Sequence, residues 1–92
     1  MKFELIYTES YCRKAAKFLR KHPEIKELYA KTLTLLELNP SHNSLRLHKP
    51  EGKFSGLFSV SINMQYRICI EFFISDNKII PVHIGSHDEV YK

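Results

Sequence analysis

The sequence predicts a two-layer α+β fold, with an N-terminal helical hairpin packed on one face of a mostly antiparallel sheet of about four strands. Three observations lead to this prediction. Residues 57–74 alternate apolar and polar side chains as strands with one buried face do. Residues 11–36 carry apolar side chains at the spacing of two amphipathic helices. The resulting order, β-α-α-β-β-β, has too few crossover helices for a parallel sheet.

Length and composition limit the class of protein. The chain has 92 residues, which suffice for one core, and we expect residues 1–92 to form a single domain. A hydrophobic content of 43% argues against disorder. The net charge of +4 suits a partner or substrate rich in phosphate, although a mildly basic surface is often only a solubility feature.

The N-terminal residues and the cysteines indicate the compartment. Residues 1–7 include the charged Glu4 and no long apolar run, which argues against a signal peptide or a membrane span. Cys12 and Cys69 have no close spacing, and Cys69 lies in an apolar stretch typical of a small buried residue. We therefore expect a cytoplasmic protein without membrane contacts.

The first half is expected to contain one strand and two helices. Residues 2–8 alternate as a strand does, and Thr8 or Ser10 can then cap a helix. The apolar face of this helix has residues at i, i+4, i+7 and i+8: Tyr11, Ala15, Phe18 and Leu19. Pro23 suits the first turn of a second helix, which Asn39 and Pro40 end.

Basic residues fill the remaining faces of the first helix. They are Arg13, Lys14, Lys17, Arg20 and Lys21. A solvated helix face explains such a run, and so does a surface that binds RNA or a partner protein.

The second half is expected to contain a loop region and three further strands. Residues 45–48 are compatible with a short strand, and residues 49–53 indicate a loop. Residues 57–74 form the hairpin, with a polar break at residues 63–65.

The last strand is expected over residues 78–84, after a turn at residues 75–77. Pro81 cannot donate to a ladder, so this strand needs a free edge or a bulge there, and Gly85 is expected to end it. The face of the sheet away from the helices, together with the 46–53 loop and the tail, then forms a concave polar surface. Arg67 lies on that face. It is either a functional cation or the ion-pair partner of Glu71.

Four segments resemble the RelE/ParE superfamily of bacterial toxins from type II toxin–antitoxin systems, in particular its RelE/YoeB/YafQ-like ribonuclease branch. They are residues 45–49, 56–63, 65–68 and 84–91, the last reading Ile-Gly-Ser-His-Asp-Glu-Val-Tyr. The resemblance implies a toxin that cleaves messenger RNA, usually on the ribosome, by attack of the 2′-hydroxyl on the adjacent phosphate. It implies no metal and no cofactor. It also implies an antitoxin partner that wraps and inhibits the toxin in a hetero-oligomer.

The resemblance assigns roles residue by residue. Arg67, in its Tyr-Arg-Ile context, corresponds to the strand arginine of the family and would clamp the scissile phosphate. His87 corresponds to the C-terminal catalytic histidine of YoeB- and YafQ-like members. Tyr91 matches a C-terminal aromatic residue that stacks on a base or orients the phosphate. His48 is the candidate acid or base that would act with His87.

The loop before the hairpin supplies candidate RNA-binding residues. Lys49 and Lys53 match basic positions of the family, and Arg46 is a weaker candidate of the same kind. Glu51 is a candidate general base, as a glutamate is in the YoeB-like branch. His83 and His87 have a spacing that suits zinc only on a helix, so we expect no metal site.

The tail departs from the family pattern. RelE-like members carry a tail rich in lysine and arginine, whereas this one reads Ser-His-Asp-Glu-Val-Tyr. The departure favours a mechanism based on histidine over a purely cationic one.

Two other functions are compatible with the same fold. One is a ParE-like inhibitor of DNA gyrase without catalysis, and the other is an inactive family member that only binds its antitoxin. The combination of Arg67, His87, Tyr91 and His48 favours the ribonuclease. Which residue is the base and which the acid, the codon preference and the ribosome dependence stay open.

Overall fold

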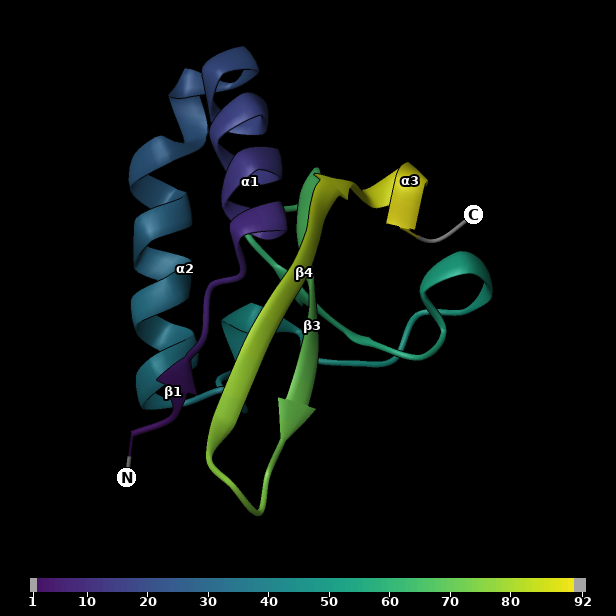
Figure 1. Ribbon diagram of the computed structural model, residues 1–92. Helices are drawn as coiled ribbons and strands as arrows, with labels where there is room; N and C mark the ends of the chain where they lie inside the picture. Colours follow the sequence, from purple (N-terminus) through teal and green to yellow (C-terminus); the bar gives the residue numbers. More distant parts are fainter. Residues whose placement is uncertain (1, 91–92) are drawn as a thin grey trace.

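The computed structural model describes residues 2–90, so Met1, Tyr91 and Lys92 are outside it. The helices and strands follow in chain order: β1 (Glu4–Leu5), α1 (Glu9–Lys21), α2 (Lys26–Leu38), β2 (Phe58–Ser61), β3 (Tyr66–Phe73), β4 (Lys78–Ser86) and α3 (His87–Val90). Helices α1 and α2 lie together on one side of the sheet, and α3 and the loop before β2 lie on the other (Figure 1).

The four strands form one sheet in the order β1-β4-β3-β2. Strand β1 runs parallel to β4, whereas the β2–β3 and β3–β4 pairs are antiparallel. The predicted α+β class, with a mostly antiparallel sheet and a helical hairpin on one face, is therefore confirmed.

Local signals explain the helix boundaries. Thr8 is the cap of α1, where its hydroxyl accepts a hydrogen bond from the Tyr11 N–H at 3.1 Å. A short 3₁₀ helix over Pro23–Ile25 precedes α2, with the proline in its first turn. Asn39 ends α2, so the predicted stop of the second helix is confirmed.

Three sequence-based boundaries are wrong. Strand β1 has two residues rather than seven, because it pairs only with Lys78 and Ile79 of β4. Residues 45–48 are not a strand, because Arg46 has a left-handed backbone with φ of 50°, and only His48 forms a bridge, with Ser59. Strand β4 continues through Gly85 to Ser86.

Pro81 lies at the predicted irregularity of β4. Ile70 pairs with Pro81 and Cys69 pairs with His83, so Val82 is an extra residue that makes a bulge. The pairing with β1 ends at Ile79, so Pro81 has no β1 residue opposite it. The missing N–H of the proline is thereby accommodated, as predicted.

The core lies between the helices and the sheet. Its fully buried residues include Leu36, Ile68, Ile70 and Ile79. Polar atoms that reach it are paired: the hydroxyl groups of Tyr11 and Tyr29 are 2.8 Å apart. The core therefore stabilises the sheet without leaving these hydroxyl groups unpaired.

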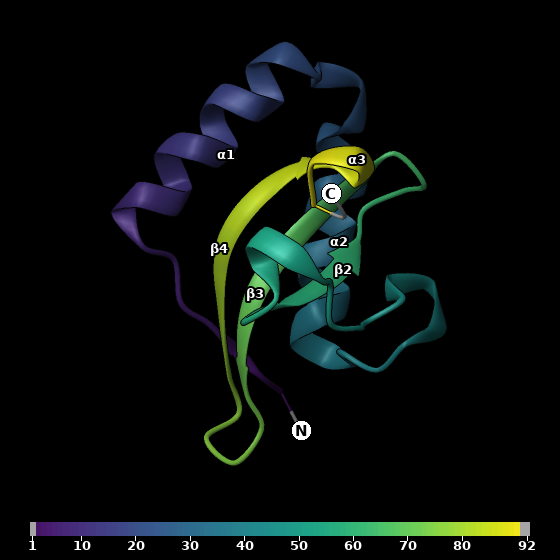
Figure 2. The same ribbon diagram turned by 90° about the vertical axis from the view of Figure 1, so that its right-hand side faces the viewer.

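The opposite face of the sheet is less open than its alternating pattern predicts. Ser59, Ser61, Arg67 and Cys69 are all buried although they lie on that face. Figure 2 shows why: the loop that precedes β2 crosses in front of the sheet, below α3. Phe54 of this loop stacks on His83 of β4, with ring centroids 4.7 Å apart.

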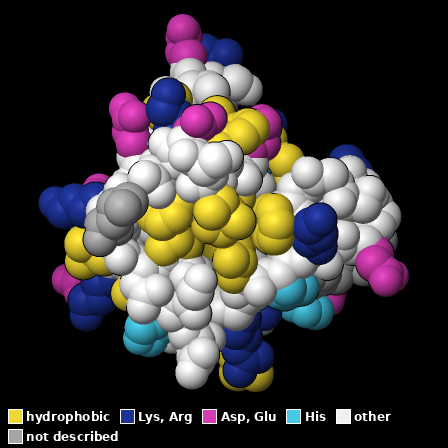
Figure 3. Space-filling view, turned by 90° about the horizontal axis from the view of Figure 1, so that it is seen from below, with side chains coloured by type: hydrophobic (Ala, Val, Ile, Leu, Met, Phe, Trp, Pro, Cys, Tyr) yellow, Lys and Arg dark blue, Asp and Glu magenta, His cyan; other side chains and the backbone are white. Residues whose placement is uncertain are grey.

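Apolar side chains also gather on the surface at one end of the molecule, surrounded by basic and histidine side chains (Figure 3). No helix within residues 2–90 combines the length and the apolar character that crossing a bilayer requires.

Candidate active site

A cavity of about 450 Å³ opens on the face of the sheet that carries α3. It is formed by the loop after α2, the turn between β2 and β3, and the junction of β4 with α3. Its described lining residues are Arg46, Met64, Gln65, Arg67, Ser86, His87 and Asp88. The cavity thus brings together two predicted residues, Arg67 and His87, that lie on different elements of the chain.

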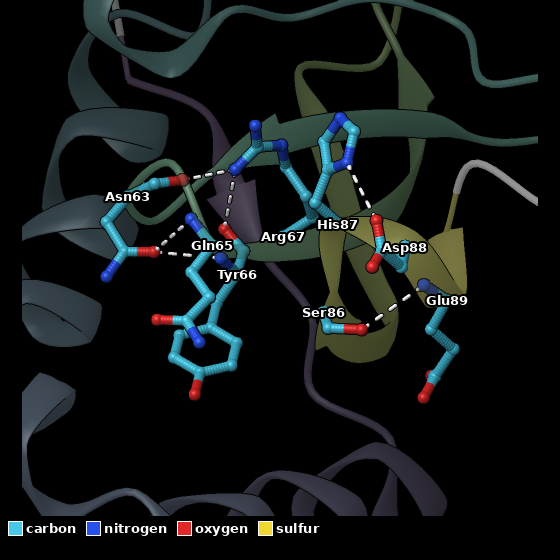
Figure 4. A network of polar contacts seen from close by, with 8 residues as sticks. All are labelled: Asn63, Gln65, Tyr66, Arg67, Ser86, His87, Asp88 and Glu89. Atoms are coloured by element: carbon cyan, nitrogen blue, oxygen red, sulfur yellow. Dashed lines mark hydrogen bonds and ion pairs between the residues drawn. The ribbon is translucent and has the colours of Figure 1, made fainter.

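Arg67 is fixed in the middle of the sheet. It lies on β3 between Ser61 of β2 and Gly85 of β4, and it is only 6% exposed. Its Nη1 donates to the carbonyl oxygens of Asn63 and Tyr66, the latter at 3.1 Å (Figure 4). The charged group is therefore held by the backbone of the β2–β3 turn, and no ion pair joins it to Glu71 within residues 2–90.

One donor of this guanidinium has no acceptor in the described chain. The Nε–H of Arg67 is buried without a hydrogen-bond partner among residues 2–90. A buried donor without a partner costs about 1–3 kcal/mol. Arg67 lines the cavity, and the fork of N–H groups that a guanidinium presents suits an oxyanion.

His87 begins α3 at the edge of the same cavity. Its backbone N–H donates to the carbonyl of Gln65 at 2.7 Å, which fastens the helix start to the β2–β3 turn. Its side chain is 49% exposed, with Nδ1 3.7 Å from an oxygen of Asp88. The imidazole is thus accessible, and it lines the same cavity as the buried guanidinium of Arg67.

A side-chain cap holds the C-terminal turn. The Ser86 hydroxyl accepts a hydrogen bond from the Glu89 N–H at 3.2 Å, as the spacing Ser-x-x-Glu of residues 86–89 indicates (Figure 4). This motif is visible in the sequence, but the tail was not predicted to be helical. Ser86 and Asp88, which line the cavity, were missed for that reason.

A second contact fastens the same turn to β4. The carboxylate of Glu89 contacts Nε2 of His83, whose ring stacks on Phe54. Gly85 makes room for it: a Cβ there would lie 3.0 Å from His83 Nε2 and closer still to the Glu89 carboxylate. These contacts position α3 and therefore His87.

Burial governs the thiol next to this contact. It raises the pKa of Cys69 from its usual 9.0 to about 11, and the charge of Glu89 adds to the shift. The thiol therefore stays protonated and inert at neutral pH, as expected of a buried structural residue. Within residues 2–90, no group of three His, Cys, Asp or Glu side chains is arranged to hold a metal ion.

Several predicted residues are not among the described lining of the cavity. His48 bonds its backbone to Ser59, and its ring Nδ1 contacts the carbonyl of Arg46. Lys49 lies over the Phe58 ring, with Nζ 5.3 Å from the centroid, and Lys53 lies over Phe54 at 5.6 Å.

Other predicted residues have different outcomes. Glu51 is exposed in the same loop, outside the described lining. Arg46 does line the cavity. Tyr91 lies outside the described residues.

Comparison of the sequence with protein-family models and with curated proteins gives no significant match. The fold, in contrast, is similar to solved structures. The E. coli DinJ–YafQ toxin–antitoxin complex matches with a TM-score of 0.74 at 15% identity, covering 100% of both chains. A YoeB/ParE toxin from Agrobacterium tumefaciens matches with 0.70 at 15% identity, covering 92% of this chain and 99% of that one.

The YoeB–YefM complex from Staphylococcus aureus matches with a TM-score of 0.66 at 15% identity, covering 95% of this chain and 99% of the other. At such identities the likeness concerns the fold alone. The resemblance to the RelE/ParE superfamily that the sequence predicts is thus confirmed at the level of the fold.

Proposed function

We propose that this protein is the toxin of a bacterial type II toxin–antitoxin system and cleaves messenger RNA, on the ribosome, in the cavity beneath α3. One observation carries the proposal: the guanidinium of Arg67, which is buried with an Nε–H that has no partner within residues 2–90, shares this cavity with the accessible imidazole of His87. The shared fold with YafQ and YoeB toxins supports it.

Arg67 is the proposed phosphate clamp. Its guanidinium donates to a non-bridging oxygen of the scissile phosphate. The guanidinium is held by two backbone carbonyls, so little reorganisation is needed as negative charge develops in the transition state.

His87 is the proposed proton-transfer group. The 2′-oxygen loses its proton and bonds to phosphorus, the bond from phosphorus to the 5′-oxygen breaks, and that oxygen takes a proton. The products are a 2′,3′-cyclic phosphate and a 5′-hydroxyl. Histidine performs either transfer near neutral pH, and His48 is the candidate for the other one. Arg46, Lys49 and Lys53 are proposed to bind flanking phosphates, and Tyr91 to contact a base.

The proposed partner is an antitoxin segment that is acidic and amphipathic. An apolar groove of about 440 Å³ runs along α2 beside Ala30, Leu35 and Leu38, with Lys31 at its border. Such a groove suits an amphipathic segment. The two complexes among the structural neighbours support the assignment of a protein partner.

The test is to express the chain alone in bacteria, to follow growth, and to map 5′ ends of a reporter message by primer extension. We expect growth arrest and discrete new 5′ ends, both lost in Arg67→Ala and in His87→Ala. His42→Ala is the matched control, because His42 is an exposed histidine outside the described lining of the cavity.

Other outcomes would redirect the assignment. Growth arrest with intact messages and blocked gyrase supercoiling would favour the ParE-like inhibitor. The absence of both growth arrest and cleavage, from a chain that still binds an antitoxin, would leave only the binding role.

A further inference from the structure

A second groove, of about 330 Å³, lies between α1 and the end of β4. Lys14, Lys17 and Lys21 of α1 line one side, and His83 and Glu89 line the other. The three lysines recur at helical spacing, so they face the groove together.

These lysines have no acidic partner of their own. Within residues 2–90, none of Lys14, Lys17 and Lys21 forms an ion pair. Glu9, the only acidic residue of α1, is paired with Arg13 at 2.9 Å. Glu89, the acidic residue of the groove, already contacts His83.

Charge interactions within α1 do not favour this row of three lysines. Like charges three and four residues apart destabilise a helix. The helix dipole favours Lys21 in the last turn, but its effect does not reach Lys14 and Lys17. A row of cations that its own helix does not stabilise suits an anionic ligand.

The groove adjoins the candidate active site. His83, Ile84 and Glu89 face the groove, whereas Ser86, His87 and Asp88 line the cavity. The same strand end and the same turn of helix therefore form the border of both. Figure 1 shows this border, with α3 beyond the end of β4 and α1 on the other side of that strand.

We infer that the groove is a second phosphate-binding site for the RNA strand whose scissile phosphate occupies the cavity. The inference rests on the proposed function and extends it, because the lysines would bind backbone phosphates without reading the sequence. The contiguity of groove and cavity favours one RNA strand over a separate acidic peptide.

The test compares two triple variants of the full chain. Lys14→Gln/Lys17→Gln/Lys21→Gln removes the row, whereas Lys2→Gln/Lys26→Gln/Lys78→Gln removes three exposed lysines elsewhere and changes the net charge equally. Glutamine preserves helix propensity. The probe is a short single-stranded RNA with methylated 2′-oxygens, which binds without being cleaved, measured by fluorescence anisotropy over a range of KCl concentrations.

We expect the groove variant to bind the RNA at least about tenfold more weakly. The slope of log K against log[KCl] should decrease by about 2 in magnitude, because each of the three lost phosphate contacts on a single strand contributes about 0.7. The control variant should change both quantities much less. Equal losses in the two variants would overturn the inference and show only a general charge effect.

Two further outcomes separate the inference from the proposed function. Unchanged RNA binding by the groove variant, with cleavage still lost in His87→Ala, would overturn the groove alone. If the groove variant instead lost binding to a polyglutamate peptide, the groove would be assigned to an acidic protein segment.

Discussion

The two faces of β3 differ in whether their buried polar groups have hydrogen-bond partners within residues 2–90. On the face toward the helices, Tyr66, Ile68 and Ile70 are buried in the core, and the Tyr66 hydroxyl is 3.1 Å from Nδ1 of His22. On the opposite face, Arg67 and Cys69 are buried as well, but the Nε–H of Arg67 has no partner within residues 2–90.

We therefore expect side chains on one face of β3 to determine the stability of the fold, and side chains on the other face to determine its function. The helix side satisfies its buried hydroxyl groups from within the chain, so changes there should alter folding before they alter function. The other side holds a buried donor that has no partner within residues 2–90, on a residue that lines the cavity, so changes there should alter function before folding.

Arg67→Lys should give the largest effect. The lysine keeps the charge but loses the planar fork and the Nε–H, so we expect messenger RNA cleavage to decrease by about 100-fold or more. The variant's melting temperature should stay close to that of the wild type, because an unsatisfied donor is removed. Cleavage at the wild-type rate would contradict the clamp role, and primer extension with thermal unfolding measures both quantities.

Gly85→Ala should disturb positioning more than folding. The added Cβ would displace the Glu89 carboxylate from His83 and shift α3, and a displacement of about 1 Å costs about 100-fold in rate. We expect a loss of cleavage of about 10- to 100-fold. Gly56→Ala is the matched control, since its Cβ would meet nothing within 4 Å. If Gly85→Ala and Gly56→Ala cleaved equally well, the position of α3 would not depend on the absence of a side chain at residue 85.

Tyr11→Phe tests the helix-side face. It leaves the buried Tyr29 hydroxyl unpaired, so we expect the free energy of unfolding to decrease by about 1–3 kcal/mol. Toxicity should persist as long as the chain folds. Urea unfolding of Tyr11→Phe, Tyr29→Phe and the double variant isolates the pair, and the double variant should be little worse than either single one. Additive losses would mean that the two hydroxyl groups are not coupled.

The smallest expected effect concerns Cys69. Ionisation of its thiol should make the stability of the fold depend on pH in the alkaline range. Burial raises the pKa of its thiol in the folded protein to about 11, above the usual 9.0. Its contribution is therefore complete below pH 9 and is lost as the pH rises through 11. Cys69→Ala should show a smaller decrease in unfolding midpoint over this interval than Cys12→Ala, because Cys12 is exposed. Identical pH profiles would contradict the assignment.

The candidate site was only partly predictable. Arg67 and His87 stand in local contexts that resemble the family, so they were predicted, and the structure brings both to one cavity. Ser86 and Asp88 were missed because the side-chain cap of residues 86–89 was not recognised as a helix start. The contact between His83 and Glu89 could not be predicted, because it depends on where the β4 bulge turns the strand.

By itself, the sequence determined the elements and the side that each helix buries, because hydrophobic periodicity and capping residues act within a few neighbours. Thr8, Pro23 and Asn39 mark helix boundaries in this way. Tertiary structure alone decided that residues 45–48 form no strand and that the second sheet face is covered by the loop before β2. It also decided which donor of Arg67 lacks a partner, since burial and hydrogen bonding depend on segments that meet only in the folded chain.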